Sequence, residues 1–204
     1  MPSRTSLLTA AVVILLVAVI ALAGHDWTED SSETGIVSVS PEHSSDGAQR
    51  AAAAISSAIG SEAMFQPTAR RQVVRRIAHP AVEQKMQAEY ARAYDALGPR
   101  IGLDKDGRPP SSTTFVARTM PAGTTLQDYS ADDAVVRVWA TGILDLAGPG
   151  PEAAAEETTQ SWFTMTLTLR WHGDRWRLID SDQTSGPEPD DTDAHHQFGH
   201  PPPL

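Results

Sequence analysis

The chain has 204 residues, a formal net charge of −10 and no cysteine. Its length suffices for one domain of ordinary size with appendages. The missing cysteines exclude a disulfide framework, a thiolate metal site and a cysteine nucleophile, and the acidic balance argues against general nucleic-acid binding, which needs a basic face.

An uncharged apolar run at residues 6–24 is the first element. A helix rising ~1.5 Å per residue over this length crosses most of a ~30 Å hydrocarbon core, so we predict a transmembrane helix. The alternative is a cleaved signal peptide, because residues 21–23 resemble a small-residue cleavage site; we favour an uncleaved anchor because signal-peptide cores are usually only ~7–15 residues long. Arg4 lies before the run and acidic residues follow it. This predicts residues 1–5 inside the cell and the rest outside, in a single-pass cell-membrane protein or, after cleavage, a secreted one.

Two segments have the composition of disordered chain. Residues 25–46 are acidic and rich in serine, and residues 187–204 are rich in proline, histidine and acidic residues. Both are poor in large apolar side chains, so we predict a disordered tether and a disordered tail. The exported folded domain is then expected at residues 47–186.

The first half of this domain has the pattern of three helices. Ser45 or Asp46 can cap a helix that runs to Gly60. A second short helix follows Pro67 and directs its arginines away from its apolar face, namely Arg71, Arg75 and Arg76. The third is expected to begin at Pro80 and to stop at Gly98, with apolar residues at spacings of three and four: Val82, Met86, Tyr90, Ala93 and Leu97.

From residue 111 onward the pattern changes to strands. We expect strands at residues 113–120, 134–146, 161–171 and 175–180, with turns in segments such as 121–125 and 147–152. Helices followed by an antiparallel meander are typical of an α+β domain. The predicted fold is therefore α+β, with helices packed on a curved four-stranded antiparallel sheet.

The last two strands define a hairpin with its own register. A two-residue turn at Gly173 and Asp174 suits the positive φ that glycine tolerates in tight hairpins. The facing pairs are then His172–Arg175, Trp171–Trp176 and Leu169–Leu178. A one-residue slip would turn the apolar side chains of the second strand to the wrong face. We therefore interpret Trp171 and Trp176 as a structural clamp.

Two other tryptophans are expected away from the core. Trp162 lies on the threonine-rich face of its strand, and Trp139 points outward if Val136, Val138 and Ala140 point inward. One interpretation is that the 147–157 loop or the chain ends cover both indoles. The other is that they belong to a protein-binding surface, where aromatic residues are enriched.

The order of these elements resembles the nuclear-transport-factor-2-like (cystatin-like) cone fold. More narrowly, the chain is similar to single-span membrane proteins of actinobacterial conjugative elements, whose last hairpin has a Trp, Gly-Asp, Trp turn and a Gly-Pro exit: Trp171, Gly173, Asp174, Trp176, Gly186 and Pro187. The architecture also resembles the assembly factor of type IV secretion systems. The resemblance implies a scaffold that contacts protein partners in the membrane or channel and often self-associates.

A search for chemistry yields no convincing site. The candidates inside or near a cone are Tyr90, Tyr94, Asp128, Tyr129 and Asp145. An active site needs polar groups that converge in a cavity, and no spacing among these residues indicates that. We therefore predict a non-enzymatic docking module without a cofactor. The alternative is a small-molecule-binding or enzymatic cone, which would require a cavity lined by buried ionisable groups.

No strong metal motif is present either. Residues 104–110 begin like a calcium loop but lack its remaining ligands, so a turn is expected. The tail histidines could contact a transition metal, but without fixed geometry we predict no metal site at His195, His196 and His200. The arginines after Pro67 could contact anionic lipid, although a solvated helix face is the simpler interpretation.

Overall fold

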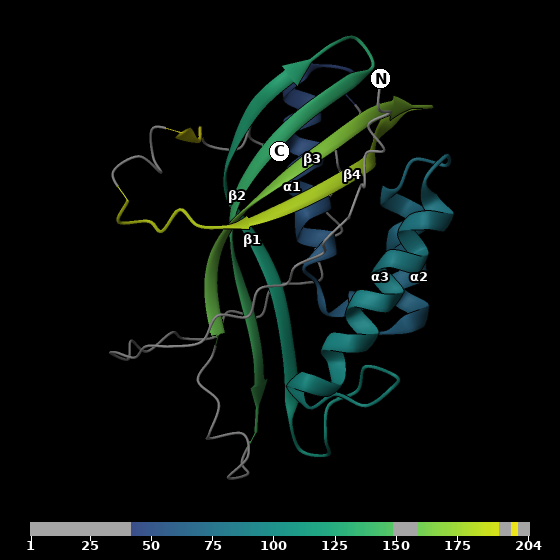
Figure 1. The fold of residues 1–204 in the computed structure, drawn as a ribbon, viewed down its shortest axis with the longest axis vertical. Helices are drawn as coiled ribbons and strands as arrows, with labels where there is room; N and C mark the ends of the chain where they lie inside the picture. The colour runs from purple at the N-terminus through teal and green to yellow at the C-terminus, as the bar shows by residue number, and fades with distance from the viewer. Residues whose placement is uncertain (1–41, 149–158, 192–196, 200–204) are drawn as a thin grey trace, which may run out of the picture.

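The computed structural model describes residues 42–148, 159–191 and 197–199. Three helices pack on a four-stranded antiparallel sheet whose strands follow one another in the order β1-β2-β3-β4 (Figure 1). The helices are α1 (Ser45–Ile59), α2 (Pro67–Ile77) and α3 (Glu83–Leu97), with 3-10 turns η1 (Glu62–Met64) and η2 (Gly98–Ile101). The strands are β1 (Thr114–Tyr129), β2 (Asp133–Ala147), β3 (Thr159–His172) and β4 (Arg175–Ser185). The predicted α+β class and four-stranded meander are confirmed.

The helix ends follow their local chemistry, with two differences from prediction. The cap of α1 is Ser44, whose side chain accepts a hydrogen bond from the backbone nitrogen of Gly47 at 3.0 Å. Helix α3 begins at Glu83 instead of Pro80. His79 accounts for the delay, because its Nδ1 accepts from Ala81 N and its carbonyl accepts from Val82 N, which together form a separate turn.

Strand β1 is longer than predicted. The segment 121–125, expected as a turn, continues the strand, and the true turn to β2 lies at residues 130–132. The register shifts between Pro121 and Gly123, so that Ala122 is an extra residue in β1. Proline lacks a ladder donor and is tolerated on an edge strand or at a bulge, and β1 offers both.

The β3–β4 hairpin has the predicted register. Trp171 pairs with Trp176, His172 with Arg175, and Leu169 with Leu178. Gly173 has a φ of +68°, so the turn uses glycine where a left-handed conformation is required.

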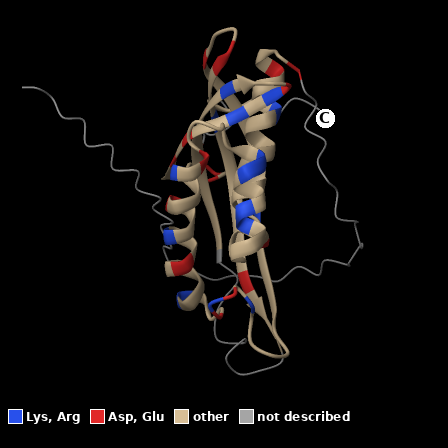
Figure 2. Cartoon of the chain, turned by 90° about the vertical axis from the view of Figure 1, so that its right-hand side faces the viewer, with Lys and Arg blue, Asp and Glu red and all other residues tan. Residues whose placement is uncertain are grey.

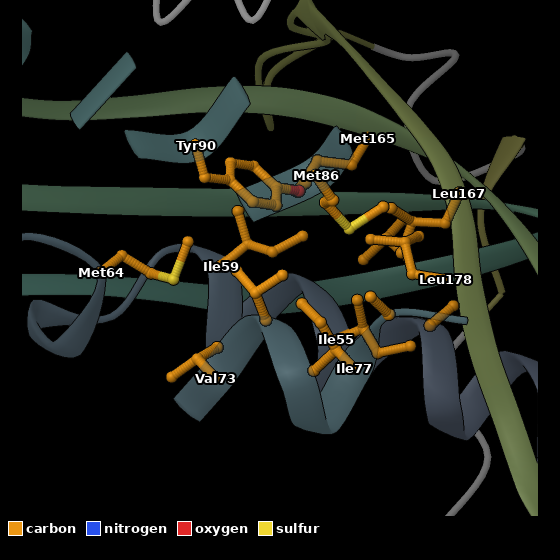
Figure 3. Close-up of a cluster of buried hydrophobic side chains, with 14 of the residues drawn as sticks. Ile55, Ile59, Met64, Val73, Ile77, Met86, Tyr90, Met165, Leu167 and Leu178 are labelled. Carbon is orange, nitrogen blue, oxygen red and sulfur yellow. The ribbon is translucent and has the colours of Figure 1, made fainter. Parts of the chain in front are cut away.

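The main core lies between the sheet and the helices. Helix α1 contacts all four strands, and α2 and α3 lie side by side at one flank (Figure 1). Figure 3 shows apolar side chains from these layers meeting in the interior: Ile55, Ile59, Val73, Ile77, Met86, Tyr90, Met165, Leu167 and Leu178. Leu167 and Leu178 are completely buried, and burial of each such side chain contributes ~1.5–3 kcal/mol.

Each edge of the sheet receives a short backbone pairing. On β4, Leu178 pairs with Ala78, the residue that follows α2. On β1, Thr124 pairs with Gly199 from the C-terminal tail. Unpaired strand edges are templates for association, so these bridges cover part of each edge.

Among the described residues no helix combines the length and the apolar character needed to cross a membrane. The predicted span at residues 6–24 lies outside the described ranges, as does most of the predicted tether.

Candidate functional site: an aromatic cluster outside the core

Trp139 and Trp162 lie together on the face of the sheet that points away from the helices. The neighbours of Trp139 in β2, Val138 and Ala140, belong to the main core, whereas Trp139 belongs to a separate apolar cluster. Trp139 pairs with Thr164 of β3, so Trp162 is its diagonal neighbour. The predicted outward direction of Trp139 is therefore confirmed.

The two indoles form a stack. Their ring centroids are 4.6 Å apart at an interplanar angle of 32°. Trp162 is half-buried, whereas only 5% of Trp139 is exposed. Such an aromatic pair contributes ~0.5–1.5 kcal/mol beyond the area that it buries.

Phe198 from the C-terminal tail completes this cluster. Its ring centroid lies 5.9 Å from that of Trp139 at an angle of 24°, and the residue is 7% exposed. We predicted a disordered tail from residue 187, but residues 197–199 pack on the sheet. The physical reason is that Phe198 is a large apolar side chain, and it packs on the only cluster of apolar side chains outside the main core among the described residues.

Backbone hydrogen bonds hold the tail beside β1. Thr124 N donates to Gly199 O at 2.9 Å, and Gly199 N donates to Thr124 O at 3.0 Å. The hydroxyl of Thr125 donates to the carbonyl of Gln197. This is strand addition over a single bridge, in which the backbone supplies affinity and the side chain beside it supplies specificity.

Gly123 permits the close approach. It pairs with Trp139 in the β1–β2 ladder, directly after the bulge. A Cβ at this position would lie 2.8 Å from Cβ of Phe198 and 2.9 Å from the carbonyl oxygen of Gly199. Any side chain here would therefore push the tail away from the sheet.

A cation also contacts the phenyl ring of Phe198. The guanidinium carbon of Arg137 is 4.8 Å from the centroid of Phe198. A guanidinium over an aromatic face is attracted by the ring quadrupole, by ~0.5–1 kcal/mol at a partly exposed site. The ring position thus favours an aromatic side chain over an aliphatic one.

The exit of β4 joins the same site. The Nε1 atom of Trp139 donates to the carbonyl of Pro187 at 2.8 Å, and the hydroxyl of Thr164 donates to the carbonyl of Gly186 at 2.9 Å. Thr164 is 3% exposed, so this bond satisfies a buried hydroxyl. The chain ends, and not the described part of the 147–157 loop, supply these contacts.

The Trp171–Trp176 hairpin has a different role. Its rings are 5.6 Å apart and edge-on, and the imidazole of His43 stacks on Trp171 at 4.3 Å. Trp176 Nε1 donates to the carbonyl of Glu42 at 3.0 Å. The hairpin therefore fastens the chain where it enters α1.

Basic side chains surround the end of α2 and the hairpin. His79 and His172 have ring centroids 4.8 Å apart. Burial lowers the pKa of His79, and electrostatic repulsion from His172, Arg170 and Arg177 lowers it further, against the opposing effect of Asp133. Acidic residues are interspersed with basic ones on this side of the molecule (Figure 2).

Of the residues considered for catalysis, only Tyr90 and Tyr94 lie together in the core, with ring centroids 6.2 Å apart, and both are occupied there. Tyr90 lies in the core with its hydroxyl 3.4 Å from the Oγ atom of Ser181, and burial raises its pKa to about 12. Tyr94 donates to the carbonyl of Ile59 at 2.5 Å, and burial raises its pKa as well. Asp128 and Tyr129 lie exposed at one end of the sheet, whereas Asp145 lies near the opposite end of β2.

The segment 104–110 is a turn, as predicted. The Oδ1 atom of Asp104 accepts from the backbone nitrogens of Asp106 and Arg108, both at 2.8 Å. These backbone bonds, that of Arg108 foremost, lower the pKa of the Asp104 carboxyl. Within the described ranges no group of three His, Cys, Asp or Glu side chains could hold a metal, and the tail histidines lie outside those ranges.

Two residues that matter here were not found from the sequence. Phe198 was missed because its surroundings have the composition of disordered chain, although it is the one large apolar residue in the tail apart from the last residue. Arg70 was missed because only the outward arginines of α2 were considered. It is 3% exposed and lies one helical turn before Val73 and Val74, so the helical period could have placed it on the buried face.

No family model, curated protein or solved structure matches this chain.

Proposed function

We propose that this chain is a non-enzymatic, membrane-anchored docking module with a cone-like exported domain. Its site is the outer aromatic face, defined as Trp139, Trp162, Gly123, Thr124 and Arg137. The supporting observation is that this face holds a segment of the tail through one backbone bridge and an aromatic ring, apart from the core that stabilises the fold. Aromatic residues and arginine are also the types enriched in protein interfaces.

The membrane part of the proposal rests on the apolar run at residues 6–24. An anchor confines the domain near the membrane and raises its concentration for partners there. A role in a conjugative transfer or type IV secretion apparatus rests on the resemblance of the hairpin and the element order alone.

The alternative, a small-molecule-binding or enzymatic cone, needs a cavity of ligand size. The cavity between α3 and β4 has a volume of about 20 Å³ and is lined by residues that include Met86, Tyr90 and Ser181. This volume suits a single water molecule. This cavity therefore gives no support to the alternative.

The test is photo-cross-linking in the native membrane. In the tagged full-length chain, a photoreactive amino acid replaces Trp162, whose side chain is half-buried. This group would capture whatever contacts the outer aromatic face. The controls are an anchor-only chain and the same photoreactive group at Arg100, an exposed position remote from the face. Capture of defined membrane or channel proteins from position 162 alone is expected. Equal capture from both positions, or capture of nothing, would overturn the proposal.

A further inference from the structure

The tail segment 197–199 shows what the outer aromatic face can recognise. Its backbone adds to the free edge of β1 through both hydrogen bonds of Thr124. Its phenyl ring contacts both the indole of Trp139 and the guanidinium of Arg137. Each contact is of a kind that a segment from another molecule could make equally well.

We propose that the outer aromatic face is a peptide-binding surface for a segment of a partner protein that pairs with the backbone of Thr124 and carries an aromatic anchor. The tail of the chain itself is the resident occupant, which the partner displaces. This inference rests on the proposed docking function and specifies the chemistry of the partner at the same site.

The anchor position requires an aromatic ring. The cation above the ring is attracted to a π face, and leucine offers none. The flat indole of Trp139 next to the Phe198 ring favours a second flat group, which can stack on it with an offset. We therefore expect Phe and Tyr to bind well and Leu to bind poorly.

The position after the anchor is less restricted. A Cβ at Gly199 would lie 3.7 Å from the carbonyl oxygen of Thr124, which is an ordinary contact. The recognition pattern is therefore an aromatic residue followed by any residue that can adopt an extended backbone.

The described contact between tail and sheet is small enough to be exchanged. It consists of the backbone bridge between Thr124 and Gly199, the hydrogen bond from the Thr125 hydroxyl and the packing of the Phe198 ring. Because the tail is covalently linked, it competes at a raised effective concentration. A partner segment must make additional contacts or be locally concentrated in order to replace it.

The experiment measures binding of a labelled peptide with the sequence of residues 192–204 to the full chain in lipid nanodiscs, by fluorescence anisotropy. Phe198→Ala in the full chain empties the ring position, and this variant should bind the peptide. The unaltered chain should bind the same peptide about tenfold or more weakly, because its own tail competes. The peptide with Phe198→Tyr should retain binding, whereas those with Phe198→Leu and Phe198→Ala should lose most of it.

Three results would overturn the inference. One is equal binding of the original peptide and its Phe198→Ala form to the Phe198→Ala chain. The second is equal binding to the unaltered and Phe198→Ala chains. The third is concentration-dependent dimerisation of the unaltered chain that Phe198→Ala abolishes, which would make a second copy the partner. Circular dichroism of the Phe198→Ala chain checks that the main core, which Phe198 does not contact, has folded. If the peptide binds but no protein is captured in the membrane, the proposed docking function is rejected and the peptide-binding inference still stands.

Discussion

Trp139 of β2 donates a hydrogen bond from its indole nitrogen to the backbone carbonyl of Pro187, at 2.8 Å, just beyond the end of β4. The ring of Phe198 stacks on the same indole. One side chain thus fixes both the start of the tail and the segment eleven residues later. The outer aromatic face and the described parts of the tail, residues 187–191 and 197–199, are therefore a single structural unit.

Trp139→Phe should weaken this unit without unfolding the domain. The variant keeps an aromatic ring for stacking but removes the donor to Pro187, and loss of such a bond costs about 0.5–1.5 kcal/mol. Urea unfolding should show a loss of this size, and a protease should cut the chain after residue 186 faster. Trp162→Phe, which changes the stacking partner instead, is the control. Unchanged cutting in Trp139→Phe would contradict the role of the indole bond.

Gly123→Ala should release the tail. The new Cβ would lie within 3 Å of Cβ of Phe198 and of the carbonyl oxygen of Gly199, so the backbones must separate. Limited proteolysis should show a rise in cleavage near residue 198. Gly199→Ala adds the same atom on the other side of the bridge with ordinary contacts and should leave cleavage unchanged. Equal behaviour of the two variants would refute the steric argument.

Gly173→Ala should destabilise the hairpin through the backbone alone. Gly173 has a φ of +68°, and a Cβ there would meet no atom within 4 Å. A left-handed conformation costs an L-residue ~1–2 kcal/mol, so the free energy of unfolding should fall by about that amount. Asp174→Ala in the same turn is the control, because its exposed ion pair with Arg175 contributes little. A negligible loss for Gly173→Ala would show that the turn can relax.

Arg70→Lys should destabilise the packing of α2. The buried guanidinium donates from Nη1 to the carbonyl of Met64 at 2.8 Å and from Nη2 to Asp95 at 2.7 Å. A lysine cannot supply both bonds in this geometry, and an unsatisfied buried group costs about 1–3 kcal/mol. Arg71→Lys, on the exposed side of the same helix, is the matched control for thermal and urea unfolding. The argument fails if both variants lose the same stability.

His79 should make stability depend on pH near neutrality. Burial and neighbouring positive charges hold its pKa below the ordinary value of 6.5, so the folded state prefers the neutral ring. The unfolded state then binds more protons just below pH 6.5, and the free energy of unfolding should fall as the pH is lowered from 7.5 to 5.5. His79→Gln should flatten this part of the profile. The pKa of the Asp174 carboxyl is also lowered, from its ordinary value of 3.8. This group therefore affects the free energy of unfolding only at acidic pH, well below the range of His79. A profile that His79→Gln leaves unchanged would assign the dependence to another group.

The hairpin shows how far local pattern can determine structure. Alternation in residues 163–171 and a glycine turn admit one register that places Leu169, Trp171, Trp176 and Leu178 on the same face, and the structure has this register up to a bulge at Ile179. The outward direction of Trp139 was predictable for the same reason, since Val136, Val138 and Ala140 fill the inward positions.

The remainder depended on contacts between distant segments. From the sequence, the Pro121–Gly123 bulge is predicted to be a turn because proline and glycine are typical of turns. In the structure, pairing with β2 keeps this segment in the strand. The sequence places Phe198 in a disordered tail because composition describes a whole segment and does not detect an individual apolar residue within it. Its partner Trp139 is 59 positions away, and no local period connects the two.

The fastening of Glu42 by Trp176 and the stacking of His43 on Trp171 have a mechanical consequence. A pull on the chain before residue 42 would load the tip of the β3–β4 hairpin together with Arg50 of α1, which pairs with Glu42, and the carbonyl of Ala131, which contacts His43. The outer aromatic face lies on the far side of the sheet, with its tail attached to the opposite edge strand. Tension at the front of the chain would thus be absorbed at the contacts of Glu42 and His43 before it could disturb what is held at Trp139.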